Sequence, residues 1–254
     1  RDSVADFLRA EVTPERIRAS WDTDGGREPA LWQQLTELGL VGITVPEAFG
    51  GLGMSALDFV LLAQECGYVA LPEPLVQTAL VAVPLLQDLG GELAATWLPA
   101  IAAGEAMVAV GLQQNVLVED AHIANLLLLE HGGAIHALTS DHYELQRSES
   151  VDPSRQLFSV TVTGAGNAVA EGEHAEHLLA RALDHGALGA AAQALGLAQR
   201  MVDLSVQYTA DRQQFGKPVG SFQAVKHHMA NVAVQLEYAR APVHRAACAL
   251  AAGA

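Results

Sequence analysis

The stretch Tyr208-Thr-Ala-Asp-Arg-Gln-Gln-Phe-Gly-Lys-Pro-Val-Gly-Ser-Phe-Gln223 separates two long helical patterns in the last third of the chain. Residues 188–210 before it are alanine-rich and contain no proline, and residues 222–252 after it continue a helical pattern. Gly216 and Pro218 favour turns, so the stretch predicts a polar turn between two helices. Ser221 is a preferred N-cap residue, and we expect it to cap the second helix.

The side chains of this turn suit a nucleotide. Arg212 carries a permanent charge on a planar fork that matches pyrophosphate oxygens. Gln214 and Gln223 offer hydrogen-bond donors and acceptors, and Phe215 and Phe222 offer faces against which an adenine or an isoalloxazine can pack. The residues alone leave two interpretations open: a nucleotide-binding corner, or an ordinary polar connection between helices.

Composition limits the classes of protein and partner. The chain has 254 residues, of which 50% are hydrophobic and 17% charged, which indicates a folded chain with a sizeable core. Its formal net charge of −15 opposes binding to a phosphate backbone, so we expect no nucleic-acid partner. Six cations near the end suit a small anionic ligand or form an ordinary helix surface: Arg200, Arg212, Lys217, Lys226, Arg240 and Arg245.

The lack of a recognisable targeting signal and the small number of cysteines lead us to expect a cytoplasmic protein. No apolar run reaches the ~18 residues of a membrane span, and the charged first residues do not resemble a signal peptide. The two cysteines, Cys66 and Cys248, lie in apolar helical stretches. We expect both to be free, buried thiols in a reducing compartment.

The order of elements predicts an α+β, mainly α, fold. Residues 1–103 read as an N-terminal helical domain, residues 104–174 as a middle β domain, and residues 175–254 as a C-terminal helical bundle. Ser55 and Asp58 are placed to cap a helix of the first domain. Strands are expected at 107–111, 123–129, 135–138, 143–146 and 157–162. The last helix is amphipathic and needs a covering partner, which makes it a candidate oligomer interface.

Other motifs indicate no site of their own. The glycine-rich residues 50–53 lack the Lys-Ser/Thr of a P-loop, and residues 164–166 lack the third glycine of a dinucleotide fingerprint. The ten histidines show no HExxH spacing, so no metal site is expected. Serines lack the context of a nucleophile elbow, so hydrolase chemistry has no support.

The turn resembles a motif of the acyl-CoA dehydrogenase family, Tyr-x-x-x-Arg-x-x-Phe-Gly-x-Pro-x-x-x-x-Gln. In that family the motif marks a turn between two helices of the C-terminal bundle, and residues 208–223 fit it position for position. Residues 35–53 are also similar to the family's first domain. The resemblance implies a fold with N-terminal helices, a middle β domain and a C-terminal four-helix bundle, in agreement with the order of elements.

The resemblance also implies FAD at a subunit interface of a homo- or hetero-oligomer, a dimer or tetramer, that oxidises an acyl-CoA substrate. The matching arginine, Arg212, is expected to reach the pyrophosphate of the neighbouring subunit's flavin. Gln213, Gln214 and Phe215 are expected to line the same site, and Phe222 and Gln223 the adenosine side. The family's usual acceptor is electron-transfer flavoprotein. A carboxylate removes the α-proton of the thioester, and a hydride leaves the β-carbon.

Three departures from the family pattern leave the catalytic base unassigned. Residues 110–116 lack the Thr-Glu-Pro-x-Ala-Gly-Ser-Asp segment that accompanies a complete flavin pocket. Residues 183–188 contain no glutamate at one family position for the base. Asp184 is the carboxylate there, and it better matches a position that contacts CoA, so we expect it to bind substrate. The other family position for the base lies beyond the residues of this chain.

Two explanations of these departures remain. In the first, a longer protein carries its own glutamate. In the second, the chain is a catalytically degenerate structural or regulatory subunit of a heteromer and lends Arg212 and Gln223 to a flavin completed by a partner. Short bacterial members of the family that oxidise CoA thioesters of bulky rings or steroid side chains are built as heteromers. The altered segment at residues 110–116 favours the second explanation.

Overall fold

The structure is a computed structural model that describes residues 1–23, 25–112, 117–164 and 166–253. Helices form the first hundred residues, and local capping explains where several begin. Thr13 accepts the N–H of Arg16 at the start of the second helix, and Ser55 and Asp58 form the expected capping box. The bounds are α1 Asp2–Glu11, α2 Pro14–Trp21, α3 Pro29–Glu37, η1 Glu47–Phe49, α4 Ala56–Tyr68, α5 Leu75–Gln77, η2 Thr78–Ala82, α6 Val83–Leu89 and α7 Gly91–Ala102.

The middle of the chain forms two small sheets. The larger has the strand order β1-β3-β4-β7, with β1 parallel to β3, and the smaller has the antiparallel order β2-β6-β5. The bounds are β1 Val108–Gly111, β2 Val118–Glu119, η3 Ala121–Ile123, β3 Leu126–His131, β4 Ala134–Leu138, η4 Ser140–His142, β5 Tyr143–Ser148, β6 Leu157–Val162 and β7 Asn167–Glu171.

The larger sheet separates two hydrophobic cores. Successive residues of β3 face opposite sides, as strand geometry requires, so Leu126 and Leu128 join the main core of the helices. Leu127 lies between them and joins Tyr143 and Phe158 in a second core between the two sheets. The β region is therefore attached to the helical body through buried side chains on one face of the larger sheet.

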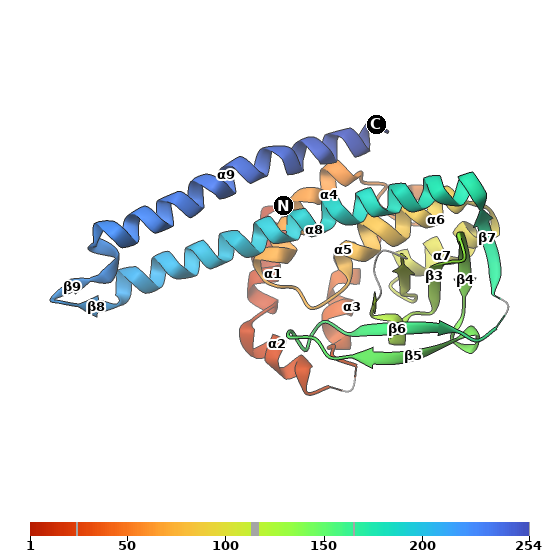
Figure 1. Ribbon diagram of the computed structural model, residues 1–254, viewed down its shortest axis with the longest axis horizontal. Coiled ribbons are helices and arrows are strands. Elements are labelled where there is room, and N and C mark those ends of the chain that lie inside the picture. The colour runs from red at the N-terminus through yellow and green to blue at the C-terminus, as the bar shows by residue number, and fades with distance from the viewer. Residues whose placement is uncertain (24, 113–116, 165, 254) are drawn as a thin grey trace.

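Two long helices form an antiparallel hairpin that extends beyond the body (Figure 1). The first is α8 Gly172–Asp211, and the second is α9 Gln223–Ala251. Between them lie β8 Gln213–Gln214, β9 Lys217–Pro218 and η5 Val219–Ser221 at the distal tip. The predicted pair of helices around a turn is thus present, and α9 continues through Pro242 without a break.

Glycines allow α8 to cross α4 at very short range. A Cβ on Gly196 would lie 1.9 Å from the carbonyl oxygen of Gln64, and one on Gly67 would lie 2.1 Å from that of Gln193. Only hydrogen atoms fit between the two backbones at these points. This crossing fixes the direction in which the distal part of α8 leaves the body.

The arrangement of helices, then sheets, then helices confirms the predicted fold class, and the exact domain limits stay a prediction. Strand β7 was not expected from sequence. Cys66 is buried and free as expected. Cys248 is also free, but its expected burial was wrong, because this thiol is exposed on α9. Among the described residues, no helix is long and apolar enough to cross a membrane.

Candidate functional site

The tip of the hairpin is a tight β-turn rather than a simple polar loop. The N–H of Arg212 donates to the carbonyl of Tyr208 at 2.9 Å and ends α8. Gln213 and Gln214 then pair with Lys217 and Pro218. Phe215 and Gly216 at the turn both have positive φ angles, 53° and 76°, the combination found in type I′ hairpins.

All six residues expected to bind cofactor lie together at this tip. Arg212, Gln213, Gln214 and Gln223 are exposed. The ring of Phe215 is 90% exposed and meets the ring of Phe222 edge-on, with centroids 6.1 Å apart. The structure therefore brings these residues together at the tip of the hairpin, in a region that we call the corner: Arg212, Gln213, Gln214, Phe215, Phe222 and Gln223.

Two cations at the tip of the hairpin, Lys217 and Arg212, differ in their surroundings. The ammonium of Lys217 lies 4.4 Å from the centroid of the Phe222 ring, a cation–π contact. Arg212 has no ion pair within the described part of the chain. Its side chain is exposed, so the guanidinium is available to an external anion.

The start of α9 corrects one expectation. Ser221 is the last residue of the 3-10 turn η5, and the N-cap is Phe222, which supplies no side-chain cap. The turn packs instead against the end of α8, where a Cβ on Gly220 would lie 2.9 Å from the carbonyl of Thr209. Backbone contact at Gly220, rather than a serine cap, thus fixes how α9 leaves the corner.

A second candidate site is a pocket of about 670 Å³ between the helical body and the β region. Its walls come from α5 and η2, from β1 and β2, and from the proximal part of α8. Most of the lining is apolar, including Val81, Val110, Leu112, Leu183 and Ala187. Sequence reasoning did not find this pocket, because the segments that line it are far apart in the chain.

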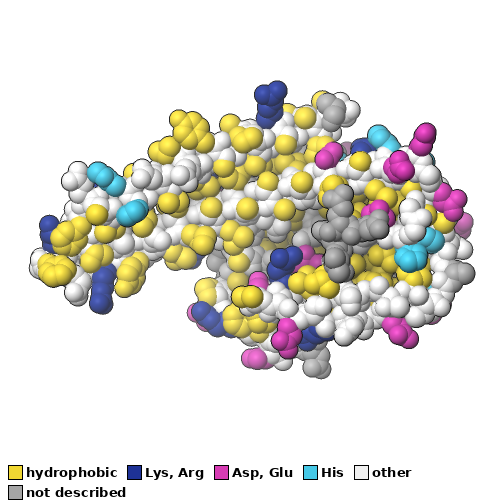
Figure 2. Space-filling model, viewed as in Figure 1, with side chains coloured by type: hydrophobic (Ala, Val, Ile, Leu, Met, Phe, Trp, Pro, Cys, Tyr) yellow, Lys and Arg dark blue, Asp and Glu magenta, His cyan; other side chains and the backbone are white. Residues whose placement is uncertain are grey.

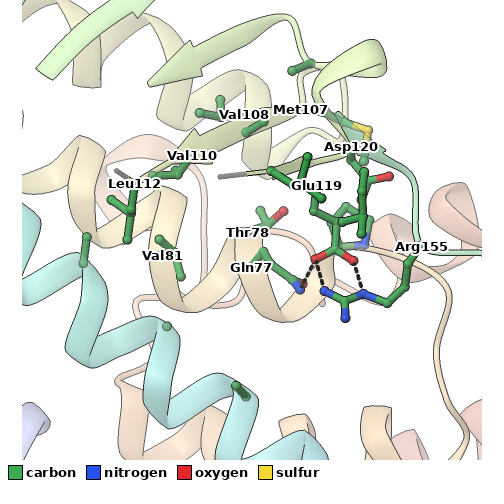
Figure 3. Close-up of a pocket in the computed structure, with 18 of the residues that line it drawn as sticks. Gln77, Thr78, Val81, Met107, Val108, Val110, Leu112, Glu119, Asp120 and Arg155 are labelled. Carbon is green, nitrogen blue, oxygen red and sulfur yellow. Dashed lines mark hydrogen bonds and ion pairs between the residues drawn. The ribbon is translucent and has the colours of Figure 1, made fainter. Parts of the chain in front are cut away.

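One end of the pocket is polar (Figure 3). Glu119 extends from β2, and one of its carboxylate oxygens accepts a hydrogen bond from the Nε2 of Gln77 at 3.1 Å. Arg155 binds the same carboxylate, with Nε 3.1 Å from Oε1. Gln77, Glu119 and Arg155 therefore link the helical body to the β region across the pocket, through the ion pair of Glu119 with Arg155.

Beside this polar end, Arg27 lies between two buried carboxylates. Its Nη1 is 3.4 Å from Glu73 Oε2, and its Nη2 is 3.2 Å from Asp120 Oδ2. Burial raises the pKa of Glu73 to about 7 and that of Asp120 to about 6, although Arg27 opposes both shifts. Asp120 also lines the pocket, so this cluster forms part of its wall.

Asp184, expected to contact CoA, is exposed on α8 and is not among the residues that line the pocket. Its neighbours Leu183 and Gly186 do line it, which places Asp184 beside the pocket. Arg212 is the C-cap of α8 and follows Ala190, the lining residue of α8 nearest the tip, by 22 residues, a distance of ~33 Å at 1.5 Å per residue. The corner therefore cannot reach the pocket of its own chain.

The catalytic base remains unassigned. Glu119 and Asp120 are the carboxylates of the described pocket lining, and arginines bind both. In the altered segment, Val110–Gly111 belongs to β1 and Leu112 lines the pocket, whereas residues 113–116 lie outside the described residues.

Histidine surroundings do not indicate metal chemistry. His185 lies in a smaller cavity of about 300 Å³ on another side of α8, and burial lowers its pKa, which favours the neutral ring. Within the described ranges, no group of three or more His, Cys, Asp or Glu side chains could hold a metal ion.

Comparison with known proteins agrees with this architecture. The family model described as the acyl-CoA dehydrogenase N-terminal domain matches residues 1–105, and the one described as the C-terminal domain matches residues 177–254. A curated relative, acyl-CoA dehydrogenase IpdE2 of Mycolicibacterium smegmatis, is 33% identical over 246 residues, which cover 96% of this chain and 74% of the relative.

Solved structures show the same fold. A chain of the Tcur3481-Tcur3483 steroid ACAD G363A variant superposes with a TM-score of 0.87 at 25% identity, covering 99% of this chain and 76% of that one. A chain of the ChsE4-ChsE5 complex from Mycobacterium tuberculosis superposes with a TM-score of 0.85 at 20% identity, covering 98% and 76%, and this likeness concerns the fold alone. The family matches, the relative and the fold together show that the chain belongs to the acyl-CoA dehydrogenase family.

Proposed function

We propose that this chain is a subunit of an oligomer that carries out FAD-dependent α,β-dehydrogenation of an acyl-CoA thioester, and that its corner binds a flavin held mainly by another chain. The observation that carries this proposal is the separation of the corner from the pocket. Because ~33 Å of helix lies between Ala190, which lines the pocket, and Arg212, one chain cannot join both sites to the same cofactor. A neighbouring chain can bring its pocket to this corner.

The side chains of the corner fit the pyrophosphate and adenosine portions of FAD. The free guanidinium of Arg212 can make two parallel hydrogen bonds to pyrophosphate oxygens. The exposed ring of Phe215 and the partly buried ring of Phe222 provide apolar faces, and the amides of Gln213, Gln214 and Gln223 can recognise ribose or adenine. When bound, the flavin supplies the hydride-accepting chemistry, and the corner residues hold and orient it.

The pocket fits the acyl part of a thioester. Its walls of valine, leucine and alanine exclude water from an apolar chain or ring system, and α8 borders it along one side. Asp184, exposed beside the pocket, is proposed to contact the CoA portion outside. We infer a bulky acyl group because structural likeness extends to a protein described as a steroid ACAD.

A second candidate function is a degenerate structural or regulatory subunit of a heteromeric acyl-CoA dehydrogenase. The ion pair of Glu119 and Arg155 at the polar end of the pocket favours it, because a carboxylate there opposes the negative charge that a flavin gains on reduction. Both carboxylates of the pocket lining, Glu119 and Asp120, are bound by arginines, which also favours this second candidate function. In this case the partner chain supplies the base, and either candidate uses electron-transfer flavoprotein as its proposed acceptor.

The substitution Arg212→Ala tests the proposal. The chain is purified alone and with acyl-CoA dehydrogenase-type chains encoded near it, and bound flavin is measured from the absorption band at about 450 nm, a property of the cofactor. Loss of a charged, bidentate contact costs about 1.5–3 kcal/mol, so flavin affinity is expected to fall about 10- to 150-fold.

Arg18→Ala is the matched control, since Arg18 is exposed on α2, far along the chain from the corner. It removes the same charge and is expected to leave the flavin content unchanged. No flavin band in any combination of chains would contradict the proposal. A normal flavin content and normal turnover by the partner after Arg212→Ala would show that the corner has no cofactor role, as expected for a purely structural subunit.

A further inference from the structure

The cluster of Arg27, Glu73 and Asp120 joins three segments of the molecule. Arg27 precedes α3, Glu73 precedes α5, and Asp120 follows β2. All three side chains are largely buried, with 9%, 1% and 12% of each exposed. The cluster is therefore a buried contact between the helical body and the pocket wall of the β region.

Charge within this cluster is not balanced. Two carboxylates share one guanidinium, and the contact with Glu73 is an ion pair without a hydrogen bond. Among the described residues, both Glu73 oxygens, Arg27 Nε, Trp32 Nε1 and His122 Nδ1 lack hydrogen-bond partners. A buried charge without a partner is costly, and a carboxyl group can avoid that cost by keeping its proton.

No neighbouring charged group supplies a second cation to balance the two carboxylates of Glu73 and Asp120. Toward Glu73 lie Arg16 and Glu28, but Arg16 is already bound by Glu28 and Glu11. Toward Asp120 lie Glu119 and Arg155, which bind each other. Burial lowers the pKa of the nearby His122 and favours its neutral form. One excess negative charge therefore remains when both Glu73 and Asp120 are ionised.

The backbone connects this charge to the pocket. Asp120 has a left-handed φ of 59°, and its N–H donates to the carbonyl of Gln156 at 2.8 Å. Arg27 holds the side chain of Asp120 on one side, while the side chain of Glu119 points to Gln77 and Arg155 on the other. Displacement of Asp120 would therefore move Glu119 and the polar end of the pocket.

We propose that Arg27 and Glu73 are positioning residues for this pocket wall: Arg27 binds the side chain of Asp120, and a proton held by the Glu73–Asp120 pair removes the excess negative charge. Loss of that proton leaves the excess charge buried and loosens the hold on residues 118–120. The proposal treats the pocket as the acyl site of the proposed function, but the properties tested below need neither flavin nor substrate.

The direction of the pH effect follows from the raised pKa values. The folded chain keeps protons on Glu73 and Asp120 up to about pH 7 and 6, whereas the unfolded chain releases them near pH 4. This contribution to stability is complete at low pH and decreases as pH rises toward 7. Between pH 5 and 8 the folded state therefore loses stability through this pair.

Glu73→Gln tests the proposal because it mimics the protonated carboxyl at every pH. At pH 5 the variant is expected to unfold at the temperature of the wild type, and at pH 8 about 2–4 °C above it. Hydrogen exchange of residues 117–124, corrected for intrinsic rates, is expected to accelerate between pH 6 and 8 in the wild type but not in the variant.

Glu237→Gln is the control, because Glu237 pairs with Arg240 at 2.9 Å on the exposed face of α9 and should show no such pH dependence. Two results would overturn the proposal. One is an unfolding temperature that depends on pH equally in Glu73→Gln and in the wild type. The other is a Glu73→Gln variant that is less stable than the wild type by the same amount at pH 5 and at pH 8. Either result leaves the flavin test of Arg212 unaffected, so the two proposals can fail separately.

Discussion

The two halves of α8 share one helix but have opposite surroundings. Residues 172–196 contain all the buried positions of the helix, which pack against α4, η2 and the larger sheet. Residues 197–211 have none, and together with α9 they carry exposed large hydrophobic side chains (Figure 2): Leu197, Met201, Leu204, Val206, Tyr208, Val232, Val234 and Tyr238.

This difference shows that the proximal half serves the fold of the chain and that the distal half is suited to contact another molecule. Scattered exposed hydrophobic residues are normal, but a concentration on one projecting hairpin indicates an interaction surface. The same hairpin presents the corner at its tip, so assembly and cofactor binding are expected to use one continuous surface.

The strongest test of the proximal half is its crossing with α4. Gly196→Ala places a Cβ 1.9 Å from the backbone oxygen of Gln64, which a side-chain rotation cannot relieve. We expect a loss of about 3 kcal/mol or more in the free energy of unfolding, measured by urea denaturation. Gly186→Ala on the same helix meets its nearest atom at 3.6 Å and should be tolerated; equal losses would contradict the account of the crossing.

A pair of truncations compares the halves directly. Leu188 is 3% exposed in the main core, and Leu188→Ala is expected to cost about 2–5 kcal/mol of unfolding free energy. Met201 is 66% exposed, and Met201→Ala should change the stability of the isolated chain by less than about 0.5 kcal/mol. Similar costs at both positions would show that the distal half is covered within one chain.

Added charge tests whether the exposed hydrophobic residues of the hairpin form an interface with another chain. Met201→Glu together with Tyr238→Glu introduces carboxylates on the exposed faces of α8 and α9, where an interface would have to bury them. Sedimentation velocity is expected to show smaller assemblies, while circular dichroism of the chain stays unchanged. An unchanged assembly would place the interface on another part of the molecule.

The two cysteines are expected to differ in their reactivity, and this difference can be measured without changing the sequence. Burial raises the pKa of the Cys66 thiol to about 12, whereas Cys248 is exposed. A thiol reagent such as Ellman's reagent is expected to modify one thiol in the native chain and a second after unfolding. Modification of both at the same rate under native conditions would contradict the burial of Cys66.

Periodicity and capping made much of the fold predictable. Each of the expected strands overlaps an observed one, because their apolar runs end in glycine and polar residues. Strand β7 was missed because Asn167–Glu171 is short, partly polar and paired with the distant β4. The exposure of Cys248 was missed because an apolar stretch does not reveal which face of a helix is covered.

The two candidate sites differ in how visible they are in the sequence. The corner is formed by consecutive residues, so one motif located all its members, although their binding roles stay predictions. The pocket and the cluster around Arg27 bring together residues 27, 73–77, 119–120 and 155, which are joined only by folding. No local pattern of charge indicates such contacts.

Photo-crosslinking at position 215 tests the central claim most directly. Phe215 is replaced by p-benzoylphenylalanine, the assembly is irradiated with flavin bound, and mass spectrometry identifies what has been attached. The same replacement at Tyr238 is the control, since it lies on the hairpin but outside the corner. We predict attachment at position 215 to FAD or to pocket residues of another chain. Attachment only to residues of the same chain, with flavin present, would contradict the claim.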